Sequence, residues 1–527
     1  MPWSSVAIPA MQREARFGDR VVPAIVARPR SIWQMVEEAA AGNPDGEALI
    51  AGETRLSWTQ TRETSARLAA GLAGLGLRRG DRIALLLGNR IEIVLAMFAA
   101  SRLGLIPVVL STRQQRPEIA YVLTDSGAAA IIHEPDFADR VPDAAEAPAL
   151  RHRIAVGSES YRDLEAIASQ DPPAAIGEED TALILYTSGT TGRPKGAMLS
   201  HFNVIHSAMI YVACMALTRD DRSIAAVPLS HVTGMVANVM TMVRCAGALV
   251  IVPDFKAAEY LAIAARERVT QTVMVPAMYN LCLLQADFDS HDLSAWRIGG
   301  YGGAPMPVAT IEKLARKVPR LQLINAYGAT ETTSPSTIMP PHLTASHLDS
   351  VGLPCPGATI VIMDEYGREA PRGSVGELWI HGGSVIKGYW NNAAATAESF
   401  TGGFWHSGDL GSIDEHGFVR VFDRKKDMIN RGGYKIYSAE VESVLASHPD
   451  VVESAIIARP CPVLGERVHA VVVTRNPQLE SFELRRLCAT QLADYKVPET
   501  IDVITEPLPR NANGKVMKKV LREQFAG

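Results

Sequence analysis

The stretch Tyr186–Gly196, YTSGTTGRPKG, directly follows the apolar run TALIL at Thr181–Leu185. The apolar run is typical of a buried strand. After it, glycines let the backbone turn and bring its N–H groups close to an anion, hydroxyls add neutral donors, and Lys195 adds a charge. A flexible linker is the alternative interpretation, but linkers rarely follow a buried strand so tightly or end in Pro-Lys-Gly. The stretch therefore predicts a phosphate-binding loop, to which a helix starting near Ser200 is expected to add its positive end.

The predicted loop is not a Walker A sequence. That motif requires a Gly-Lys-Ser/Thr ending, whereas Lys195 is preceded by Pro194 and followed by Gly196. Ordinary P-loop NTPase chemistry is therefore disfavoured.

Size and composition set bounds on the class of protein. A chain of 527 residues is too long for one compact core and predicts two to four domains or subdomains. With 47% hydrophobic and 21% charged residues, the composition is that of an ordinary soluble globular protein. A net charge of -5 argues against a nucleic-acid partner. The six scattered cysteines form no CxxC pair, which favours a reduced, cytoplasmic setting over disulfides or a zinc site.

No membrane segment is expected. The N-terminal stretch lacks the sustained apolar region of a signal peptide. The most apolar segment, Val227–Val252, is interrupted by Pro228, His231, Asn238 and Arg244, and it predicts a buried helix followed by a buried strand.

Hydrophobic patterns predict an α/β fold. Helical and extended patterns alternate from residue 31 to 132 and again from residue 223 to 324, which predicts two doubly wound, mostly parallel sheets. Short segments separated by Gly and Pro then predict a small β-rich subdomain, and the last hundred or so residues predict a smaller α+β domain. The expected limits are 1–424 for the N-terminal domain (about 1–180, 181–345 and 346–424), 425–427 for the hinge, and 428–527 for the C-terminal domain.

Several polar loops are expected at the carboxyl ends of the second set of strands, so they could face one crevice with the phosphate loop. One of them, Asn325–Thr333, reads NAYGATETT. Within it, Glu331 is suited to hold a Mg²⁺ ion that bridges phosphate oxygens, because that cation prefers carboxylate. Thr330 could donate to a phosphate oxygen, and Tyr327 has a face on which a purine can stack.

Together these motifs resemble those of the adenylate-forming superfamily, which contains acyl-CoA synthetases, adenylation domains and beetle luciferases. The resemblance covers the chain from about residue 30, with the motifs in the family's order. It adds GGAP at Gly302–Pro305 as the adenine segment and HSGDLG at His406–Gly411 as the ribose motif. The residues that it assigns to ATP and AMP are Thr187, Ser188, Gly189, Thr190, Thr191, Gly192, Lys195, Gly302, Gly303, Ala304, Pro305, Asn325, Ala326, Tyr327, Gly328, Thr330, Asp409 and Arg424.

The resemblance also implies roles in catalysis and domain movement. Lys515 matches the catalytic lysine of a mobile C-terminal domain, and Lys426 matches the hinge, although Asp423 stands where many relatives have Gly. The implied catalytic residues are Lys515, Lys195, Thr330, Glu331 and His231, with Glu331 as the metal ligand. The implied acyl pocket contains His231, Val232, Met235, Tyr301 and Ala329, and the implied CoA tunnel contains Arg431, Gly432, Gly433, Tyr434 and Lys435.

The resemblance implies an ATP-dependent carboxylic acid–CoA ligase that uses ATP, Mg²⁺ and coenzyme A. No arginine stands out among the acyl residues, so an apolar monocarboxylate (medium-chain, branched or aromatic) is expected. The alternatives are a stand-alone adenylation enzyme that loads a carrier-protein thiol, a luciferase-like oxygenase, and an inactive nucleotide-binding regulator. The expected partners are small molecules, and the sequence leaves the oligomeric state open, with a homodimer as one option.

Overall fold

The computed structural model describes residue 3 and residues 6–168, 173–188, 193–304, 306–511 and 515–525, with the backbone alone at Ser188. The chain forms two compact units. Unit 1 consists of Met1–Pro305, Glu312–Ile360 and Ile380–His406, and unit 2 consists of Met306–Ile311, Val361–Trp379 and Ser407–Gly527. The domain limits that the sequence suggests at residues 424 and 428 stay predictions.

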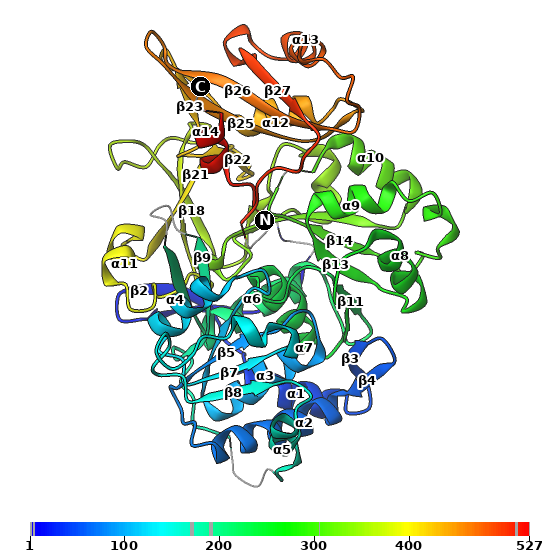
Figure 1. Ribbon diagram of the computed structural model, residues 1–527, viewed down its shortest axis with the longest axis vertical. Coiled ribbons are helices and arrows are strands. Elements are labelled where there is room, and N and C mark those ends of the chain that lie inside the picture. Colours follow the sequence, from blue (N-terminus) through cyan, green and yellow to red (C-terminus); the bar gives the residue numbers. More distant parts are fainter. Residues whose placement is uncertain are drawn as a thin grey trace. The chain divides into compact units, whose positions relative to one another are not determined.

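The first sheet of unit 1 has six strands in the order β10-β9-β6-β5-β7-β8, and Figure 1 shows β5, β7 and β8 side by side. All neighbouring strands are parallel except β9 and β10, as predicted for a doubly wound sheet. The strands are β5 (Arg82–Leu86), β6 (Ile106–Val109), β7 (Ala130–His133), β8 (His152–Ala155), β9 (Thr181–Ser188) and β10 (Pro194–Ser200).

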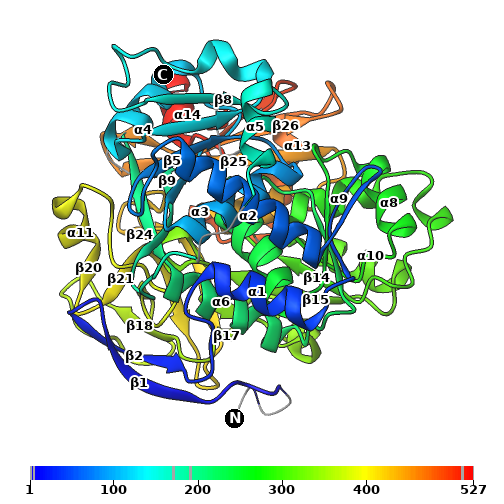
Figure 2. The same ribbon diagram turned by 90° about the horizontal axis from the view of Figure 1, so that it is seen from below.

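Helices of unit 1 alternate with these strands. The central one, α3 (Ile91–Leu103), is buried from Ile93 to Ser101 because other elements cover it, and Gly104 ends it in a left-handed conformation. Figure 2 shows α3 beside α1 (Ile32–Gly42) and α2 (Trp58–Gly74), which both contact it. The other helices of this region are α4 (Arg116–Ser126), α5 (Glu159–Ala166) and the 3₁₀ turn Pro135–Arg140.

The second sheet has nine strands in the order β17-β16-β15-β14-β13-β11-β12-β3-β4. Its centre is parallel, and strands from both sides of residue 180 enter it, because β3 pairs with β12. The strands are β3 (Glu47–Ala51), β4 (Thr54–Ser57), β11 (Arg222–Ala225), β12 (Ala248–Ile251), β13 (Gln271–Met274), β14 (Ile298–Tyr301), β15 (Gln322–Tyr327), β16 (Thr337–Ile338) and β17 (Leu353–Pro354).

Further helical segments lie between residues 201 and 399. They are α6 (His201–Cys214), a π-helix (Thr233–Met240), α7 (Thr241–Cys245), α8 (Ala257–Arg266), α9 (Pro276–Leu283), α10 (Val308–Lys317) and α11 (Ala393–Ser399), with 3₁₀ turns at Phe288–Ser290, Thr330–Thr332 and Pro341–Ser346. The π-helix, α7 and β12 occupy the apolar segment Val227–Val252, so the predicted buried helix and strand are confirmed. Among the described residues, no helix has the length and apolarity needed to cross a membrane.

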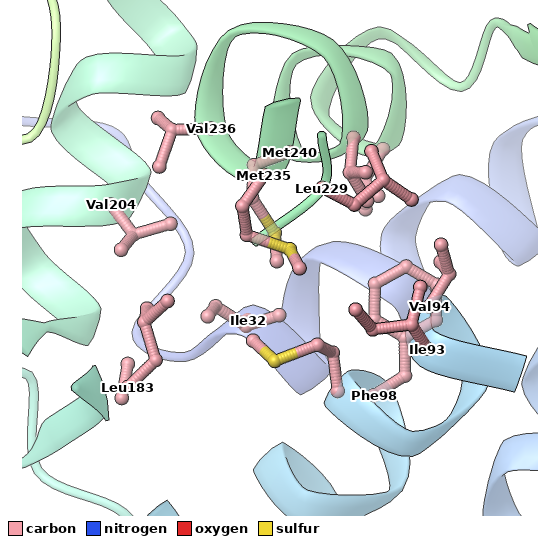
Figure 3. Close-up of a cluster of buried hydrophobic side chains, with 14 of the residues drawn as sticks. Ile32, Ile93, Val94, Phe98, Leu183, Val204, Leu229, Met235, Val236 and Met240 are labelled. Atoms are coloured by element: carbon pink, nitrogen blue, oxygen red, sulfur yellow. The ribbon is translucent and has the colours of Figure 1, made fainter. Parts of the chain in front are cut away.

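The core of unit 1 is assembled from these helices and from strand β9. Figure 3 shows Ile32 of α1, Phe98 of α3, Leu183 of β9, Val204 of α6 and Met235 of the π-helix pointing toward one another. All five side chains are buried in one hydrophobic cluster. Segments far apart in the sequence therefore share a core, and the start of the predicted phosphate loop is anchored in it.

A hairpin that the sequence did not suggest opens the described chain. It pairs β1 (Met11–Arg16) with β2 (Arg20–Ile25) and is seen in Figure 2 as a separate ribbon. Behind it, the guanidinium of Arg28 is 1% exposed and lies 2.8 Å from Glu14 and 2.6 Å from Glu178. This ion-paired cluster connects the hairpin to the segment before β9.

From residue 359 onward the chain first forms β-rich structure and then mixed α and β structure, in line with the sequence. One sheet has the order β18-β19-β21-β20, with β22 paired to β21, and another has the order β24-β23-β26-β25, with β27 paired to β26. The strands are β18 (Thr359–Met363), β19 (Gly376–His381), β20 (Phe400–Thr401), β21 (Phe404–Ile413), β22 (Val419–Arg424), β23 (Ile429–Arg431), β24 (Tyr434–Ile436), β25 (Val451–Cys461), β26 (Gly465–Thr474) and β27 (Thr500–Ile504). The helices are α12 (Ser438–Leu445), α13 (Ser481–Gln491), α14 (Lys518–Gln524) and a 3₁₀ turn at Asp494–Lys496.

Candidate functional site

The predicted phosphate loop connects two antiparallel strands. Lys195 of β10 pairs in register with Thr187 of β9, so both residues lie on the strands that flank the loop. The turn residues Gly189, Thr190, Thr191 and Gly192, and the side chain of Ser188, fall outside the described residues.

The expected contribution of a helix dipole to this loop is wrong. Helix α6 does begin directly after Ser200, which caps it. However, β10 runs back from the loop, and Ser200 pairs with Thr181 at the far end of β9. At about 3.3 Å per strand residue, the helix begins roughly 20 Å from the loop. The effect of a helix dipole is confined to the first turn, so α6 does not act on an anion there.

Side chains from other elements fix the base of the hairpin. The Tyr186 hydroxyl donates to Asp125 at 2.5 Å, and the Tyr121 hydroxyl donates to the carbonyl of Pro194 at 3.1 Å. Burial, and then the Asp125 carboxylate, raise the pKa of Tyr186 well above its ordinary value, so its hydroxyl stays protonated as a donor. On the outer side, the N–H of Trp390 donates to the carbonyl of Gly196 at 2.7 Å. The strands that carry Thr187 and Lys195 are therefore rigidly placed.

The motif of residues 325–333 brings a carboxylate to this hairpin. Strand β15 ends at Tyr327, which is half-buried, and Thr330 begins a 3₁₀ turn that carries Glu331. Glu331 is only 9% exposed. Its Oε1 atom accepts from the Thr187 hydroxyl at 3.4 Å and from the Tyr389 hydroxyl at 3.0 Å. The structure thus brings Thr187 and Glu331 together, as the sequence analysis expected for one crevice.

Tyr389 is a residue that the sequence analysis missed. It is 6% exposed, and its ring lies under the Lys195 ammonium, with 5.2 Å between Nζ and the ring centroid. Burial, and then the charge of Glu331, raise its pKa, so the hydroxyl is a donor to that carboxylate. The only local signal is an aromatic residue after Gly388 in a segment without clear periodicity, which does not predict contact with a distant loop.

The surroundings of Glu331 fit a magnesium ion. Within the described residues it receives two hydroxyl donors and no ion pair with lysine or arginine, whereas a buried charge is usually paired or bound to a metal. No cluster of three metal-binding side chains occurs in the described part of the chain. The donor set therefore suits Mg²⁺, which commonly takes one or two protein carboxylates and completes its shell with phosphate oxygens and water.

The predicted adenine segment follows β14, beside the end of β15. Tyr301 and Asn325 pair in register on these strands. A Cβ atom on Gly302 would lie 2.3 Å from the carbonyl oxygen of Ala326, so only glycine allows the two backbones to approach this closely. Gly303 has a φ of 79°, and Ala304 and Gly328 are exposed, whereas Pro305 lies outside the described residues. The two loops thus leave adjacent strands at the same edge.

The predicted acyl residues come from two separate parts of unit 1. His231 and Val232 are half-buried and lie just before the π-helix. Short π-helical segments are often found at functional sites. Met235 is fully buried in the core shown in Figure 3. Tyr301 is 3% exposed, and burial raises its pKa to about 12. Ala329 is half-buried and lies directly before the turn that carries Glu331.

The predicted ribose residues are paired in unit 2. Asp409 of β21 and Arg424 of β22 face each other in register, and Arg424 Nε lies 2.7 Å from Asp409 Oδ1. The Asp409 side chain is 6% exposed, whereas that of Arg424 is 45% exposed. Arg424 also donates to the carbonyl of Ser407 at 3.1 Å. In this ion pair the Asp409 carboxylate is buried, whereas the Arg424 guanidinium is partly exposed to solvent.

The predicted hinge lies between Asp423 and Asp427, whose carboxylates are both hydrogen-bonded. Lys426 is exposed in the turn after β22. Before it, the Asp423 carboxylate accepts from the N–H of Ser438 at 2.5 Å and from its hydroxyl at 3.0 Å. After it, Asp427 accepts from Arg522 of α14 at 2.6 Å. Both flanks of Lys426 are therefore bonded to helices of unit 2.

The remaining predicted residues lie on exposed loops of unit 2. Gly432 and Gly433, both with positive φ, make the turn between β23 and β24, beside the exposed Lys435. Tyr434 is exposed and stacks on Tyr495, with centroids 4.5 Å apart, while Arg431 lies 2.6 Å from Glu499. Lys515 is also exposed, and its backbone is held by two hydrogen bonds to Asn511.

Two family models match the sequence. The model described as AMP-binding enzyme matches residues 36–390, and that described as AMP-binding enzyme C-terminal domain matches residues 440–515. The first covers more than half of the chain.

Characterised proteins of similar length resemble the whole chain. A feruloyl-CoA synthase of an Amycolatopsis species is 35% identical over 92% of this chain and 96% of its own. A long-chain-fatty-acid–CoA ligase of Mycobacterium tuberculosis is 32% identical over 94% of this chain and 99% of its own. The solved o-succinylbenzoate CoA synthetase of Bacillus subtilis, in complex with its acyl-adenylate intermediate, is 31% identical, covers 94% of this chain and 99% of its own, and has a TM-score of 0.85. The same synthetase has also been solved with ATP and magnesium ion, with a TM-score of 0.84.

Proposed function

Because the chain belongs to the AMP-binding enzyme family, as one of its adenylate-forming acyl-CoA synthetases, it is an ATP-dependent acid–CoA ligase, and we propose that its acid is an apolar monocarboxylate. ATP, Mg²⁺ and coenzyme A are the cofactors of this reaction. The placement of Thr187 and Lys195 beside the buried carboxylate of Glu331 is the observation that supports the residue assignments most directly.

In the first half-reaction, an oxygen of the substrate carboxylate attacks the α-phosphorus of ATP. The bond to the β-phosphate oxygen breaks, pyrophosphate leaves with the electron pair, and acyl-AMP remains. Lys195, Thr330 and the loop amides bind phosphate oxygens, and Glu331 would hold Mg²⁺, which would supply positive charge to stabilise the leaving group. Asp409 and Arg424 bind the ribose, and the segments after β14 and β15 bind the adenine.

In the second half-reaction, the CoA thiolate attacks the acyl carbonyl, and the bond to AMP breaks. The hairpin Arg431–Lys435 is proposed to line the path of the pantetheine arm, since its two glycines keep the backbone narrow. Lys515 is proposed to act only in the first half-reaction, where its charge stabilises the reacting phosphate and carboxylate. Lys426 is the proposed pivot between the two half-reactions, and its exposed position supports this.

The acid is proposed to be aromatic, branched or of medium chain length. None of the five proposed acyl residues is an arginine or a lysine, whose charge would favour a second carboxylate. Tyr301 and Met235 are bulky and almost completely buried, which favours a compact acyl group over a long chain. Feruloyl-CoA synthase, at 35% identity, provides an aromatic precedent among the relatives.

The function is tested by a panel of acids with ATP and Mg²⁺, in which pyrophosphate release is followed first and acyl-CoA and AMP formation second. Pyrophosphate and acyl-CoA that depend on an aromatic or medium-chain acid are the expected result. Pyrophosphate without thioester would point to a carrier-protein acceptor instead of CoA. Preference for a dicarboxylate or a long-chain acid would contradict the proposed pocket.

The role of Lys515 gives a sharper test of the mechanism. Lys515→Ala should slow acyl-AMP formation by about 100-fold or more, because one preorganised charge at the reacting centre is lost. ATP binding should be nearly unchanged, as measured by calorimetry. The exposed Lys519→Ala serves as the matched control on α14. Unchanged adenylation in Lys515→Ala would refute the assignment.

The cytoplasm is the proposed setting. All six cysteines are free thiols, and five of them are buried, which suits a reducing compartment.

A further inference from the structure

We propose that Tyr389 is a positioning residue for the adenylation site: its hydroxyl orients the carboxylate of Glu331, and its ring holds the ammonium of Lys195 away from that carboxylate. This inference rests on the proposed roles of Lys195 toward phosphate and of Glu331 toward Mg²⁺. It concerns a residue outside every motif that the sequence analysis used.

The backbone fixes the position of Tyr389 against the phosphate hairpin. Residues 388–390 lie along the outer side of β10, where Met198 N–H donates to Gly388 at 3.1 Å and Trp390 N–H donates to Gly196 at 2.7 Å. Tyr389 itself forms an antiparallel bridge with Ala197. Its ring also packs edge-on against Phe400, with centroids 6.2 Å apart. The ring is therefore held from the backbone and from its far side.

A positive and a negative side chain both contact Tyr389. Lys195 Nζ lies over the ring face, 5.2 Å from its centroid, and Glu331 Oε1 lies 3.0 Å from its hydroxyl. Within the described residues, no ion pair joins Lys195 to Glu331. Each charge instead has a separate contact with the tyrosine, one with the negative ring face and one with the polar hydroxyl.

Keeping the two charges apart matters before Mg-ATP binds. A direct ion pair between a half-buried lysine and a buried glutamate would be favourable at low dielectric, and ATP and Mg²⁺ would have to break it before binding. A cation–π contact stabilises the Lys195 ammonium less than a direct ion pair would, so the ammonium stays available to phosphate. The tyrosine thus acts as a spacer that prepares both groups for Mg-ATP.

The hydroxyl has a second effect on Glu331. Tyr389 and Thr187 both donate to the same oxygen, Oε1, so together they restrict rotation of the carboxylate. Hydrogen bonds to a metal-binding carboxylate usually set its orientation, and their loss typically lowers metal affinity or activity about 10- to 100-fold.

Two substitutions separate the two effects. Tyr389→Phe keeps the ring and loses the hydroxyl, so the Mg²⁺ or Mn²⁺ needed to saturate the ATP complex should rise about tenfold, while ATP binding without metal stays unchanged. Tyr389→Leu loses both contacts and should weaken ATP binding as well. Calorimetric titration of ATP, with and without Mn²⁺, measures both affinities independently of turnover. Tyr161→Phe, which removes another buried tyrosine hydroxyl on α5, is the matched control and should change neither.

A double-mutant cycle shows whether Tyr389 acts through Glu331. In a Glu331→Gln background, Tyr389→Phe should cause no further loss of metal affinity, whereas a general packing role would give additive losses. Unchanged metal affinity in Tyr389→Phe, or additive losses in the cycle, would overturn the inference. If Glu331→Gln itself leaves metal affinity unchanged, the assignment of Glu331 as metal ligand fails instead, so the two failures are distinguishable.

Discussion

Arg28 shows how a single residue can hold the start of the chain in place. Its guanidinium is almost completely buried between the carboxylates of Glu14 and Glu178, and hydrogen bonds from Arg28 lower the pKa of Glu14 to about 2. Removal of one member of a buried ion pair leaves the others without compensation. Loss of Arg28 would therefore destabilise the whole N-terminal hairpin.

Arg28→Met should lower the free energy of unfolding by about 3 kcal/mol, because two half-buried carboxylates lose their buried partner. Arg16 and Arg30, which also contact Glu178, compensate in part. The change is measured as the shift in the urea midpoint of the transition that involves unit 1. Arg13→Met on the exposed side of β1 is the control and should shift stability by less than about 0.5 kcal/mol. Equal effects of the two substitutions would contradict a structural role for the ion pairs.

At the scale of elements, the best sequence predictions came from strongly apolar segments. Helix α3 lies between residues 31 and 132, where alternating helices and strands were predicted, and Gly104 ends its apolar run at a clear point. Strands β3 and β4 were missed, because β4 pairs only with β3, and β3 pairs with β12 about 200 residues away, which local periodicity does not reveal. The helix after the phosphate loop was found, but its position was not, because the intervening β10 reverses the chain.

The site residues also divide into those that short motifs predict and those that depend on distant strand pairing. Lys195 and Glu331 were predicted because their residue types within short motifs suit phosphate and Mg²⁺. Tyr389 was not, because its role depends on a backbone segment that adds to the edge of β10 from about 190 residues away. Contacts made by side chains across such distances follow from topology, and no short motif records them.

Helix α12 has an unusual cap that supports a prediction at the element scale. Asp423, fifteen residues before Ser438, accepts from the first N–H of the helix, and Lys518 of α14 donates to the Ser438 hydroxyl at 2.6 Å. Burial raises the pKa of Asp423, whereas the nearby charge of Lys518 opposes this. Asp423 thus connects β22 to α12 and, through Ser438, to α14.

Asp423→Ala should destabilise the start of α12 by about 1 to 2 kcal/mol, because a helix N–H loses its acceptor. Asp423→Asn keeps an acceptor oxygen and should cost less than half as much. Hydrogen exchange at the amides of Ser438 to Glu440 measures the local effect, and Glu415→Ala in an exposed turn is the control. Protection that is unaffected in Asp423→Ala would show that the carboxylate is not the functional cap.

At the scale of the whole molecule, buried neutral histidines connect distant segments. In unit 1, His201 accepts from the N–H of Ile32 at 3.2 Å, and His206 accepts from the N–H of Ile25 at 3.1 Å. Burial lowers the pKa of both to about 4. Each ring nitrogen acts as an acceptor only while it is unprotonated, so the attachment of the N-terminal segment to α6 depends on pH.

The stability of unit 1 should therefore fall as pH is lowered from about 6.5 toward 4. In this window the unfolded chain binds protons at these histidines and the folded chain does not, so each contributes a slope of up to about 1.4 kcal/mol per pH unit. Above pH 6.5 both states are neutral, and the histidines add no pH dependence. Urea unfolding at pH 7.5, 6.0 and 5.0 measures the slope, and the double variant His201→Gln and His206→Gln should flatten it. His416→Gln, in an exposed turn, should leave the slope unchanged. A steep acid slope that persists in the double variant would assign it to the paired carboxylates, whose protonation also destabilises the fold but mainly below pH 4.5.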